Sequence, residues 1–383
     1  MDRRTFLQGS LGAAIAAAAP QAAAQAARAP ASMPSPELAV DARSVWLAGD
    51  SAPPDPAAMA ARLDALAQGQ DIVRDRYLEE GEVAAMEDAF ARLLGKEDCA
   101  FLATGTLANN VAVRVLCGEH RRALVQRESH LYLDEVDAAQ RLSGINLLPL
   151  APDRAIPTLE EVRAAIDASE NGPYPMRIGA VSLESPVRRA NGEMVPLERV
   201  REIARVARAH GARLHLDGAR LLLAPPAFDL AAYAAEFDTV YVSLYKYLGA
   251  PFGAVLAGTK ADIAEARALR RLYGGNLYQG WMPAMLALDA LPGFRRDIVQ
   301  AHDRAARLIA ALVDSGKVRD RTSPHASNIH MLEMSEPLAA AAFERGRRAG
   351  VRIRRWQDGV VPLSVNTTIL RRPVEEYVAL FLG

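Results

Sequence analysis

Alternating helix-type and strand-type segments predict an α/β fold with a mainly parallel sheet. Short apolar runs alternate with amphipathic patterns across residues 82–272, and this order is typical of βαβ units with helices on both faces of a sheet. The chain has 383 residues, half of them hydrophobic, which is more than one compact core usually contains. A second, smaller domain is therefore expected.

The individual elements follow from local signals. The pattern over residues 82–94 ends at Gly95, which is a helix C-cap signal. Thr158 is followed three residues later by Glu161, as in a capping box. Helices are expected at residues 82–94, 106–116, 131–142, 158–168, 197–210, 231–237, 260–272 and 282–291. Strands are expected at residues 99–103, 122–126, 145–150, 178–184, 214–217, 239–244 and 254–257.

The last of these strands follows a tight loop, so it is the candidate for an antiparallel position. A long helix is expected from about residue 298, with helix and strand patterns continuing to Gly383. The predicted organisation is a signal peptide, a linker with an N-terminal arm, a large cofactor-binding domain and a small α+β domain, at residues 1–27, 28–75, 76–295 and 296–383. We find no internal repeat.

The N-terminus has the features of an export signal. Arg3 and Arg4 precede Phe-Leu, an alanine-rich apolar run covers residues 11–19, and small-residue cleavage options lie at residues 22–27. Twin arginines favour the Tat route, with an ordinary Sec signal or a lipid-free anchor as the alternative. The run is too short to span a bilayer comfortably. A periplasmic protein, exported folded and without a membrane span after cleavage, is expected.

Composition excludes some functions. The 45 basic and 46 acidic residues nearly cancel, which gives no reason to expect a nucleic-acid partner. Cys99 and Cys117 are the two cysteines of the sequence and form no disulfide framework. Both are expected to be free thiols, with Cys99 buried. No metal site is predicted.

An acid and a lysine stand at the ends of two neighbouring apolar strands. Asp217 ends a strand in RLHLDGARLLL (residues 213–223), and Lys246 follows another in DTVYVSLYKYLGAPFGAVLAG (residues 238–258). Each residue alone would usually be solvated. Together, at the strand ends where open α/β sheets bind ligands, they match one cofactor. Pyridoxal phosphate needs an amine for covalent attachment and an acid that keeps its pyridine nitrogen protonated.

The same two segments resemble the threonine aldolase branch of the aromatic amino acid β-eliminating lyases. The likeness runs from about Asp71 to about Asp303. It includes KEDCAFLATGTLANN, ESH, PLERV and ALRRLYGGNLYQG, at residues 96–110, 128–130, around 197 and 268–280. The resemblance implies a PLP-dependent transferase-like fold (fold type I) and a homodimer or homotetramer whose sites are completed across a subunit interface. It also implies a small amino acid as substrate.

Cofactor roles follow from the residues and the resemblance together. Lys246 is expected to bind the cofactor covalently, and Asp217 to pair with its pyridine nitrogen. Gly105 and Thr106 lie between a strand and a helix, where free N–H groups bind phosphate. Ser243, three residues before Lys246, is a further candidate phosphate donor.

Three more residues concern substrate and catalysis. His130 is expected to stack on the cofactor and to carry protons, a surface loop histidine being the alternative. Lys246, once released by the substrate amine, is the other candidate acid or base. Arg220 is expected to hold the substrate carboxylate by its guanidinium fork. His215 is interpreted as a core histidine and left out of the site.

The chain also departs from the threonine aldolases. Residues 184–187 read Glu-Ser-Pro-Val where those enzymes carry Glu-Asn-Thr-His, and Pro362 and Tyr278 stand where they have arginines. The leading hypothesis is a PLP-dependent lyase that cleaves a β-substituted, preferably β-hydroxy, amino acid in the manner of a threonine aldolase. Other PLP chemistry, such as β-elimination or transamination, and a non-catalytic PLP-binding protein are the alternatives.

Overall fold

The computed structural model describes residues 43–69 and 71–383. The predicted signal peptide and residues 28–42 of the predicted arm lie outside the described residues. Within the described ranges, no helix combines the length and apolarity needed to cross a membrane.

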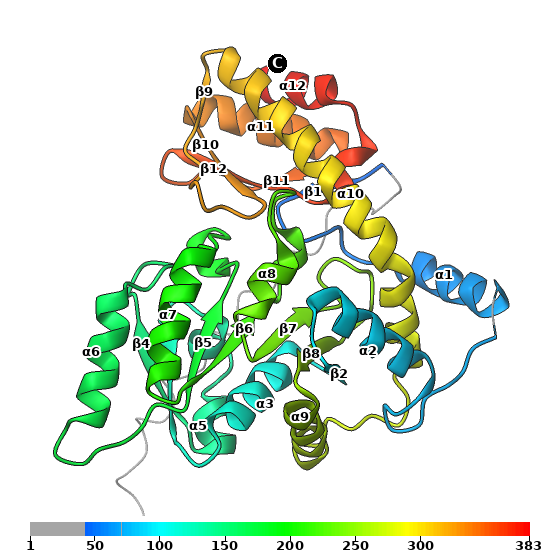
Figure 1. Cartoon of the computed structure of the whole chain (residues 1–383). Coiled ribbons are helices and arrows are strands. Elements are labelled where there is room, and N and C mark those ends of the chain that lie inside the picture. The colour runs from blue at the N-terminus through cyan, green and yellow to red at the C-terminus, as the bar shows by residue number, and fades with distance from the viewer. Residues whose placement is uncertain (1–42, 70) are drawn as a thin grey trace, which may run out of the picture. The chain divides into compact units, whose positions relative to one another are not determined.

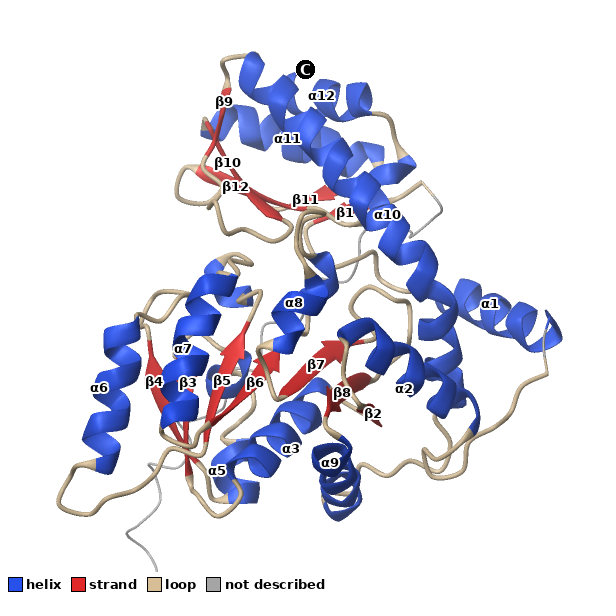
Figure 2. Ribbon diagram, viewed as in Figure 1, coloured by secondary structure: helices blue, strands red, loops and turns tan. Residues whose placement is uncertain are grey.

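The central sheet has seven strands in the order β2-β8-β7-β6-β5-β3-β4 (Figures 1 and 2). They span Asp98–Leu102 (β2), Arg122–Gln126 (β3), Asn146–Leu150 (β4), Ala180–Glu184 (β5), Arg213–Asp217 (β6), Thr239–Ser243 (β7) and Ala254–Gly258 (β8). Strands β4, β3, β5, β6 and β7 pair in parallel, and β8 runs antiparallel to both β7 and β2. The predicted mainly parallel sheet, with the strand at 254–257 reversed, is confirmed.

Both faces of this sheet are buried. In β2, Cys99 and Phe101 belong to one apolar cluster and Ala100 and Leu102 to another, because successive side chains of a strand point to opposite faces. The helices that supply the covering residues are α2 (Gly81–Leu94), α3 (Gly105–Cys117), α6 (Leu159–Glu170), α7 (Leu197–Ala209), α8 (Leu230–Ala235) and α9 (Lys260–Leu272). Cys99 and Cys117 are free and Cys99 is buried, as predicted, and Cys117 is buried as well.

The single helix expected at residues 131–142 is wrong. Two short helices, α4 (His130–Leu133) and α5 (Ala138–Ser143), stand in its place. Val136 and Asp137 between them have positive φ, which helical backbone does not allow. The break turns the Glu135 side chain inward, where hydrogen bonds to Asn109 and Asn110 hold it. Apolar spacing could not reveal this contact.

The two helices expected at 282–291 and from 298 form one helix, α10 (Trp281–Asp314), with Pro292 inside it. Leu291 and Phe294 are buried on either side of the proline, so packing keeps the helix continuous although one backbone hydrogen bond is missing. The predicted domain boundary at 295/296 falls within this helix, and the described residues 43–69 and 71–383 belong to one compact unit. The division into large and small domains stays a prediction.

The C-terminal elements are β9 (Val318–Asp320), β10 (Ile329–Met334), α11 (Glu336–Ala349), β11 (Val351–Ile353), β12 (Val360–Ser364) and α12 (Val374–Leu382). Strands β12, β10 and β9 make one antiparallel sheet. The segment predicted as linker and arm is described from residue 43, with residue 70 left out, and this part contains a strand and a helix. Its residues Val45–Leu47 form β1, which pairs in parallel with β11, and Pro56–Gly69 form helix α1. This pairing brings the loop after β1 to the edge of the site.

Candidate active site

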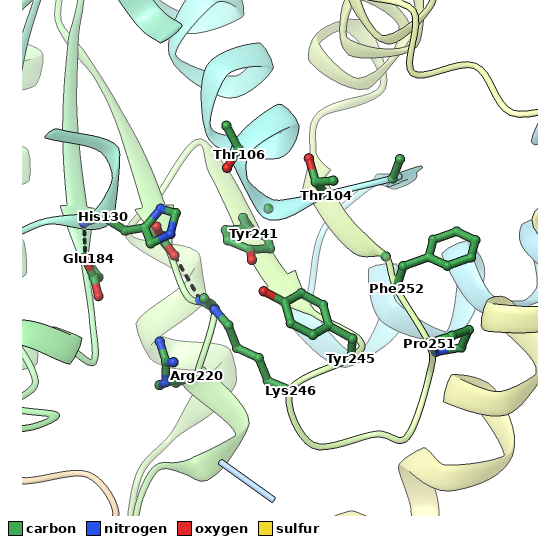
Figure 3. Close-up of a pocket in the computed structure, with 15 residues that line it drawn as sticks. Thr104, Thr106, His130, Glu184, Arg220, Tyr241, Tyr245, Lys246, Pro251 and Phe252 are labelled. Atoms are coloured by element: carbon green, nitrogen blue, oxygen red, sulfur yellow. Dashed lines mark hydrogen bonds between the residues drawn. The ribbon is translucent and has the colours of Figure 1, made fainter. Parts of the chain in front are cut away.

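A cavity of about 360 Å³ opens at the carboxyl ends of the parallel strands (Figure 3). Its wall comes from the β2–α3 turn, the start of α4, the ends of β5 and β6, and the loop that follows β7. It is lined by Ala103, Thr104, Gly105, Thr106, His130, Glu184, Asp217, Ala219, Arg220, Tyr241, Tyr245, Lys246, Pro251, Phe252 and Gly253. Six of the seven predicted site residues therefore share one cavity, and Ser243 is the exception.

Lys246 and Asp217 both reach this cavity, as their strand-end positions predicted. Burial, and secondarily the neighbouring Arg220 guanidinium, lower the pKa of Lys246 to about 8. Its Nζ makes no hydrogen bond or ion pair with the described residues. Asp217 is buried and accepts hydrogen bonds from Asn109 Nδ2 at 2.7 Å and from the Ala219 N–H at 3.1 Å. The site thus holds a reactive amine near a fixed carboxylate.

The start of α3 can bind an anion. The first N–H groups of a helix have no partner inside it, and here the Thr104 hydroxyl caps only Leu107, at 3.1 Å. Gly105 and Thr106 are left to face the cavity. A Cβ on Gly105 would lie 2.1 Å from the Tyr241 hydroxyl, so only glycine fits this turn.

Ser243 ends β7 behind this cavity wall. Its Oγ is buried without a hydrogen-bond partner among the described residues, and such groups are uncommon in folded proteins. A phosphate would supply the acceptor that this hydroxyl lacks. Its predicted role as a phosphate donor stays a prediction, since Ser243 does not line the cavity.

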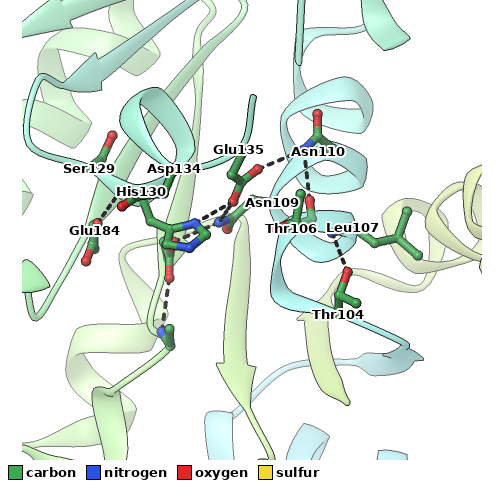
Figure 4. Close-up of polar contacts among 12 residues, drawn as sticks. Thr104, Thr106, Leu107, Asn109, Asn110, Ser129, His130, Asp134, Glu135 and Glu184 are labelled. Atoms are coloured by element: carbon green, nitrogen blue, oxygen red, sulfur yellow. Dashed lines mark hydrogen bonds and ion pairs between the residues drawn. The ribbon is translucent and has the colours of Figure 1, made fainter. Parts of the chain in front are cut away.

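A network of hydrogen bonds connects Asp217 and His130 to buried side chains next to the cavity (Figure 4). Asn109 Nδ2 donates both to Asp217 Oδ2 at 2.7 Å and to Glu135 Oε1 at 2.8 Å. Asn110 Nδ2 lies 2.8 Å from Glu135 Oε2, and His130 Nδ1 lies 2.9 Å from Glu135 Oε1. The hydrogen bond to Glu135 raises the pKa of His130, while burial raises that of Glu135. His130 is therefore held by a carboxylate and presents its ring to the cavity.

The sequence did not identify Asn109, Asn110 or Glu135 as site residues. A signal was available, because two adjacent asparagines are buried in the otherwise apolar helix α3, and buried polar groups require partners. His215 was interpreted correctly as a core histidine, but it also belongs to this network. Its Nε2 lies 3.0 Å from Asn109 Oδ1 and its Nδ1 lies 2.9 Å from Thr239 Oγ1.

The protonation of His215 fixes the direction of these bonds. Burial lowers its pKa to about 4, so the ring is neutral at physiological pH. Since the Asn109 amide nitrogen faces two carboxylates, its oxygen accepts from His215 Nε2–H. The Thr239 hydroxyl then donates to Nδ1.

Glu184 is a second acid of the cavity that the sequence did not single out as a site residue. Its carboxylate accepts the His130 N–H at 2.6 Å and the Arg188 N–H at 2.9 Å. Burial, and then the charge of Asp217, raise its pKa above the ordinary value. Glu184 fixes the backbone of His130 and so the start of α4.

Arg220 lies at the cavity wall with one edge already paired. Its Nε and Nη2 donate to Asp50 Oδ1 and Oδ2, at 2.7 and 2.8 Å. Asp50 belongs to the segment predicted as linker and arm. Val187, Pro362 and Tyr278, where the resemblance led us to expect substrate residues of other types, do not line the cavity.

These residues suit pyridoxal phosphate. Lys246 can attach it, Asp217 can pair with the pyridine nitrogen, and His130 can face the ring. The free N–H groups at Gly105 and Thr106 suit the phosphate. Among the described residues, no cluster of three potential metal ligands occurs.

Comparisons with known proteins agree with this site. Residues 47–337 match the beta-eliminating lyase family. The low specificity L-threonine aldolase of Escherichia coli (strain K12) is 30% identical over 309 residues, which cover 80% of this chain and 90% of that enzyme. The alanine racemase TOXG of Cochliobolus carbonum is 33% identical over 228 residues, 57% of this chain and 56% of that protein.

A solved structure from Exiguobacterium sp. 255-15, assigned to the aromatic amino acid beta-eliminating lyases/threonine aldolases, superimposes with a TM-score of 0.75. It is 25% identical, and the match covers 89% of this chain and 96% of that one. The predicted fold type I architecture is confirmed. With its lysine, acid and anion-binding turn in one cavity, this chain belongs to the beta-eliminating lyase family and is a pyridoxal-phosphate-dependent lyase.

Proposed function

We propose that this lyase cleaves the Cα–Cβ bond of a β-hydroxy-α-amino acid, releasing glycine and an aldehyde. The observation that carries this proposal is one cavity that holds Lys246, Asp217, His130 and Arg220, in a chain related to L-threonine aldolases. Pyridoxal phosphate, when bound, accepts the electron pair that is left on Cα. The protein residues must then orient the substrate and move two protons.

Arg220 and Asp217 supply the fixed charges. Arg220 keeps Nη1 free of hydrogen bonds to the described residues, and this edge suits the substrate carboxylate. Asp217 is held by Asn109 and Ala219, so its carboxylate would be fixed for pairing with the pyridine nitrogen. These contacts are set before substrate arrives, and such preorganisation favours charge development in the transition state.

His130 is the candidate that takes the proton from the β-hydroxyl. Its Nδ1 is engaged by Glu135, so Nε2 is the ring nitrogen left to exchange a proton. The histidine that threonine aldolases carry at the position of Val187 is absent, and Val187 is fully buried. Lys246, once free, would return a proton to Cα.

A second candidate is different chemistry on the same cofactor. The similarity to alanine racemase TOXG and the changed substrate residues favour testing proton transfer at Cα, elimination and transamination as well. A panel of threonine, allo-threonine, phenylserine, serine and alanine separates these activities. Glycine plus an aldehyde identifies an aldolase, pyruvate plus ammonia an eliminase, and inversion of alanine a racemase. No glycine from any β-hydroxy substrate would refute the aldolase proposal, and a spectral change without turnover would indicate a non-catalytic binder.

We further propose a homodimer or homotetramer in which residues 274–279 complete a neighbouring site. Tyr278 in this loop is exposed and packs edge-on against the exposed Tyr77, with ring centroids 5.5 Å apart. Leu272, just before the loop, is also exposed. Exposed apolar residues gathered in this way favour a subunit interface. A monomer with full cofactor occupancy in solution scattering would contradict this proposal.

The periplasm is the proposed location, with export through the Tat route. The basis is the Arg3-Arg4 pair before the apolar run. Replacing both arginines by lysine should trap the protein in the cytoplasm. Undiminished export of that variant would point to the Sec route.

A further inference from the structure

We propose that Asp50 is a positioning residue for the substrate carboxylate. It holds one edge of the Arg220 guanidinium and turns the other edge toward the cavity. This inference rests on the proposed role of Arg220 in the lyase reaction, and it assigns a function to a segment that the sequence predicted to be only a linker and arm.

The contact between the two side chains is bidentate. Arg220 Nε lies 2.7 Å from Asp50 Oδ1, and Nη2 lies 2.8 Å from Oδ2. Two parallel bonds fix both the position and the plane of a guanidinium, which a single bond does not. Arg220 lines the cavity and Asp50 does not. Asp50 therefore binds the Nε and Nη2 edge of the guanidinium from outside the cavity, and Nη1 remains available to a substrate inside it.

The charge balance also assigns this role to Asp50. The side chain of Arg220 is only 13% exposed, and a buried guanidinium needs a counter-charge. The two acids that line the cavity are already engaged. Glu184 accepts the N–H groups of His130 and Arg188, and Asp217 accepts from Asn109 and Ala219. Among the described residues, Asp50 is the ion-pair partner of Arg220.

The backbone next to Asp50 is itself fixed. Asn366, which is buried, donates through Nδ2 to the Trp46 carbonyl at 2.6 Å and to the Gly49 carbonyl at 2.9 Å. The Trp46 N–H donates to Thr368 Oγ1 at 2.9 Å. The loop after β1 is thus tied to the C-terminal part of the chain, so Asp50 reaches Arg220 from a rigid support.

The variant Asp50→Ala should leave the Arg220 guanidinium free to rotate. The charged side chains that line the cavity are all retained, because Asp50 is not one of them. We expect glycine to bind the holoenzyme about 10-fold more weakly or worse, since hydrogen bonds to charged groups are strong. The KM for the β-hydroxy substrate should rise by a similar factor, with kcat little changed. Asp50→Asn, which keeps one acceptor oxygen in place, should lose less.

The measurement is the absorbance change of the holoenzyme on titration with glycine and, separately, with methylamine. Methylamine offers the amine without a carboxylate, so its affinity should not change in Asp50→Ala. The ratio of the two affinities isolates the carboxylate contact from any effect on cofactor binding or folding.

Asp262→Ala is a matched control. Asp262 also makes a bidentate pair with an arginine, accepting from Arg213 Nη1 at 2.8 Å and from Nη2 at 2.6 Å, and Arg213 begins strand β6 at the end away from the cavity. Losing that pair should leave the ratio of glycine to methylamine affinity unchanged. An unchanged ratio in Asp50→Ala, or tighter glycine binding, would overturn the inference and show that Asp50 competes with substrate. If glycine caused no spectral change in the parent holoenzyme, the proposed function would fail together with this inference.

Discussion

Asn109 Nδ2 lies 2.7 Å from Asp217 Oδ2 and 2.8 Å from Glu135 Oε1. One amide group therefore joins Asp217, the candidate partner of the pyridine nitrogen, to Glu135, which contacts the His130 ring. All three side chains are buried. The Asn109 oxygen accepts from the neutral His215, which prevents the amide from flipping. One asparagine therefore positions Asp217 directly and His130 through Glu135.

The variant Asn109→Ala should weaken cofactor binding by about 10-fold or more. Asp217 and Glu135 would each lose one buried donor, keeping the Ala219 N–H on Asp217 and the Asn110 and His130 contacts on Glu135, and a hydrogen bond to a buried charge is worth more than an ordinary one. Asn110→Ala is the matched control, because Asn110 contacts Glu135 and the Thr106 carbonyl but makes no hydrogen bond to Asp217. Titration of the apoprotein with pyridoxal phosphate measures the difference. Equal affinities of the two variants would contradict the assignment.

Gly105→Ala should abolish cofactor binding. The added Cβ would stand 2.1 Å from the Tyr241 hydroxyl and 2.7 Å from its ring, and Tyr241 is buried and cannot move away. The start of α3 would be displaced together with its N–H groups. Gly293→Ala, inside α10, meets only Arg296 Nη2 at 3.8 Å and should stabilise the fold by up to about 1 kcal/mol. Thermal unfolding and cofactor titration of both variants check this, and normal cofactor affinity in Gly105→Ala would refute the anion site.

The rate at which Lys246 captures the cofactor should rise with pH through about 8. Burial and Arg220 lower the pKa of its amine to that value, and only the neutral amine is a nucleophile. Arg220→Met removes a positive neighbour and should move the midpoint to higher pH. Rapid mixing of apoprotein with pyridoxal phosphate at several pH values gives both curves. An unchanged midpoint in Arg220→Met would show that Arg220 does not affect the pKa of this lysine. In Lys246→Ala, borohydride should not fix the cofactor to the protein.

Much of the fold and half of the site were readable from local sequence. Strand ends carrying Asp217 and Lys246, and the Gly105-Thr106 turn, are short-range features, and strand order then brings them to one edge of the sheet. Helix 158–168 was placed by its capping box, which the structure contains.

The remainder depends on contacts between distant segments. Glu135 lies at the break between α4 and α5, where Asn109 and Asn110 donate to its carboxylate, and the apolar pattern around it gives no sign of this. Asp50 lies 170 positions from Arg220 in a stretch rich in alanine and proline, so only the pairing of β1 with β11 reveals it. The helix end expected at residue 291 is absent, because Leu291 and Phe294 are packed on both sides of Pro292 and keep α10 continuous.

Glu184→Gln should flatten the pH dependence of stability. Burial raises the pKa of Glu184 above its ordinary value of 4.5, so the folded protein holds a proton that the unfolded chain releases as pH rises above 4.5. Because the folded state then binds more protons, stability falls with rising pH until the folded-state carboxyl has also ionised. The variant removes this contribution, which is at most about 1.4 kcal/mol per pH unit for one proton.

Glu87 and Glu135, whose pKa values are also raised by burial, still make the unfolding free energy of the variant fall with rising pH. Urea unfolding of the apoprotein between pH 5 and 7.5 should therefore give a smaller loss of unfolding free energy for Glu184→Gln than for the parent. If the two slopes coincide, Glu184 is ionised throughout this range, and its contacts with the His130 and Arg188 N–H groups outweigh its burial.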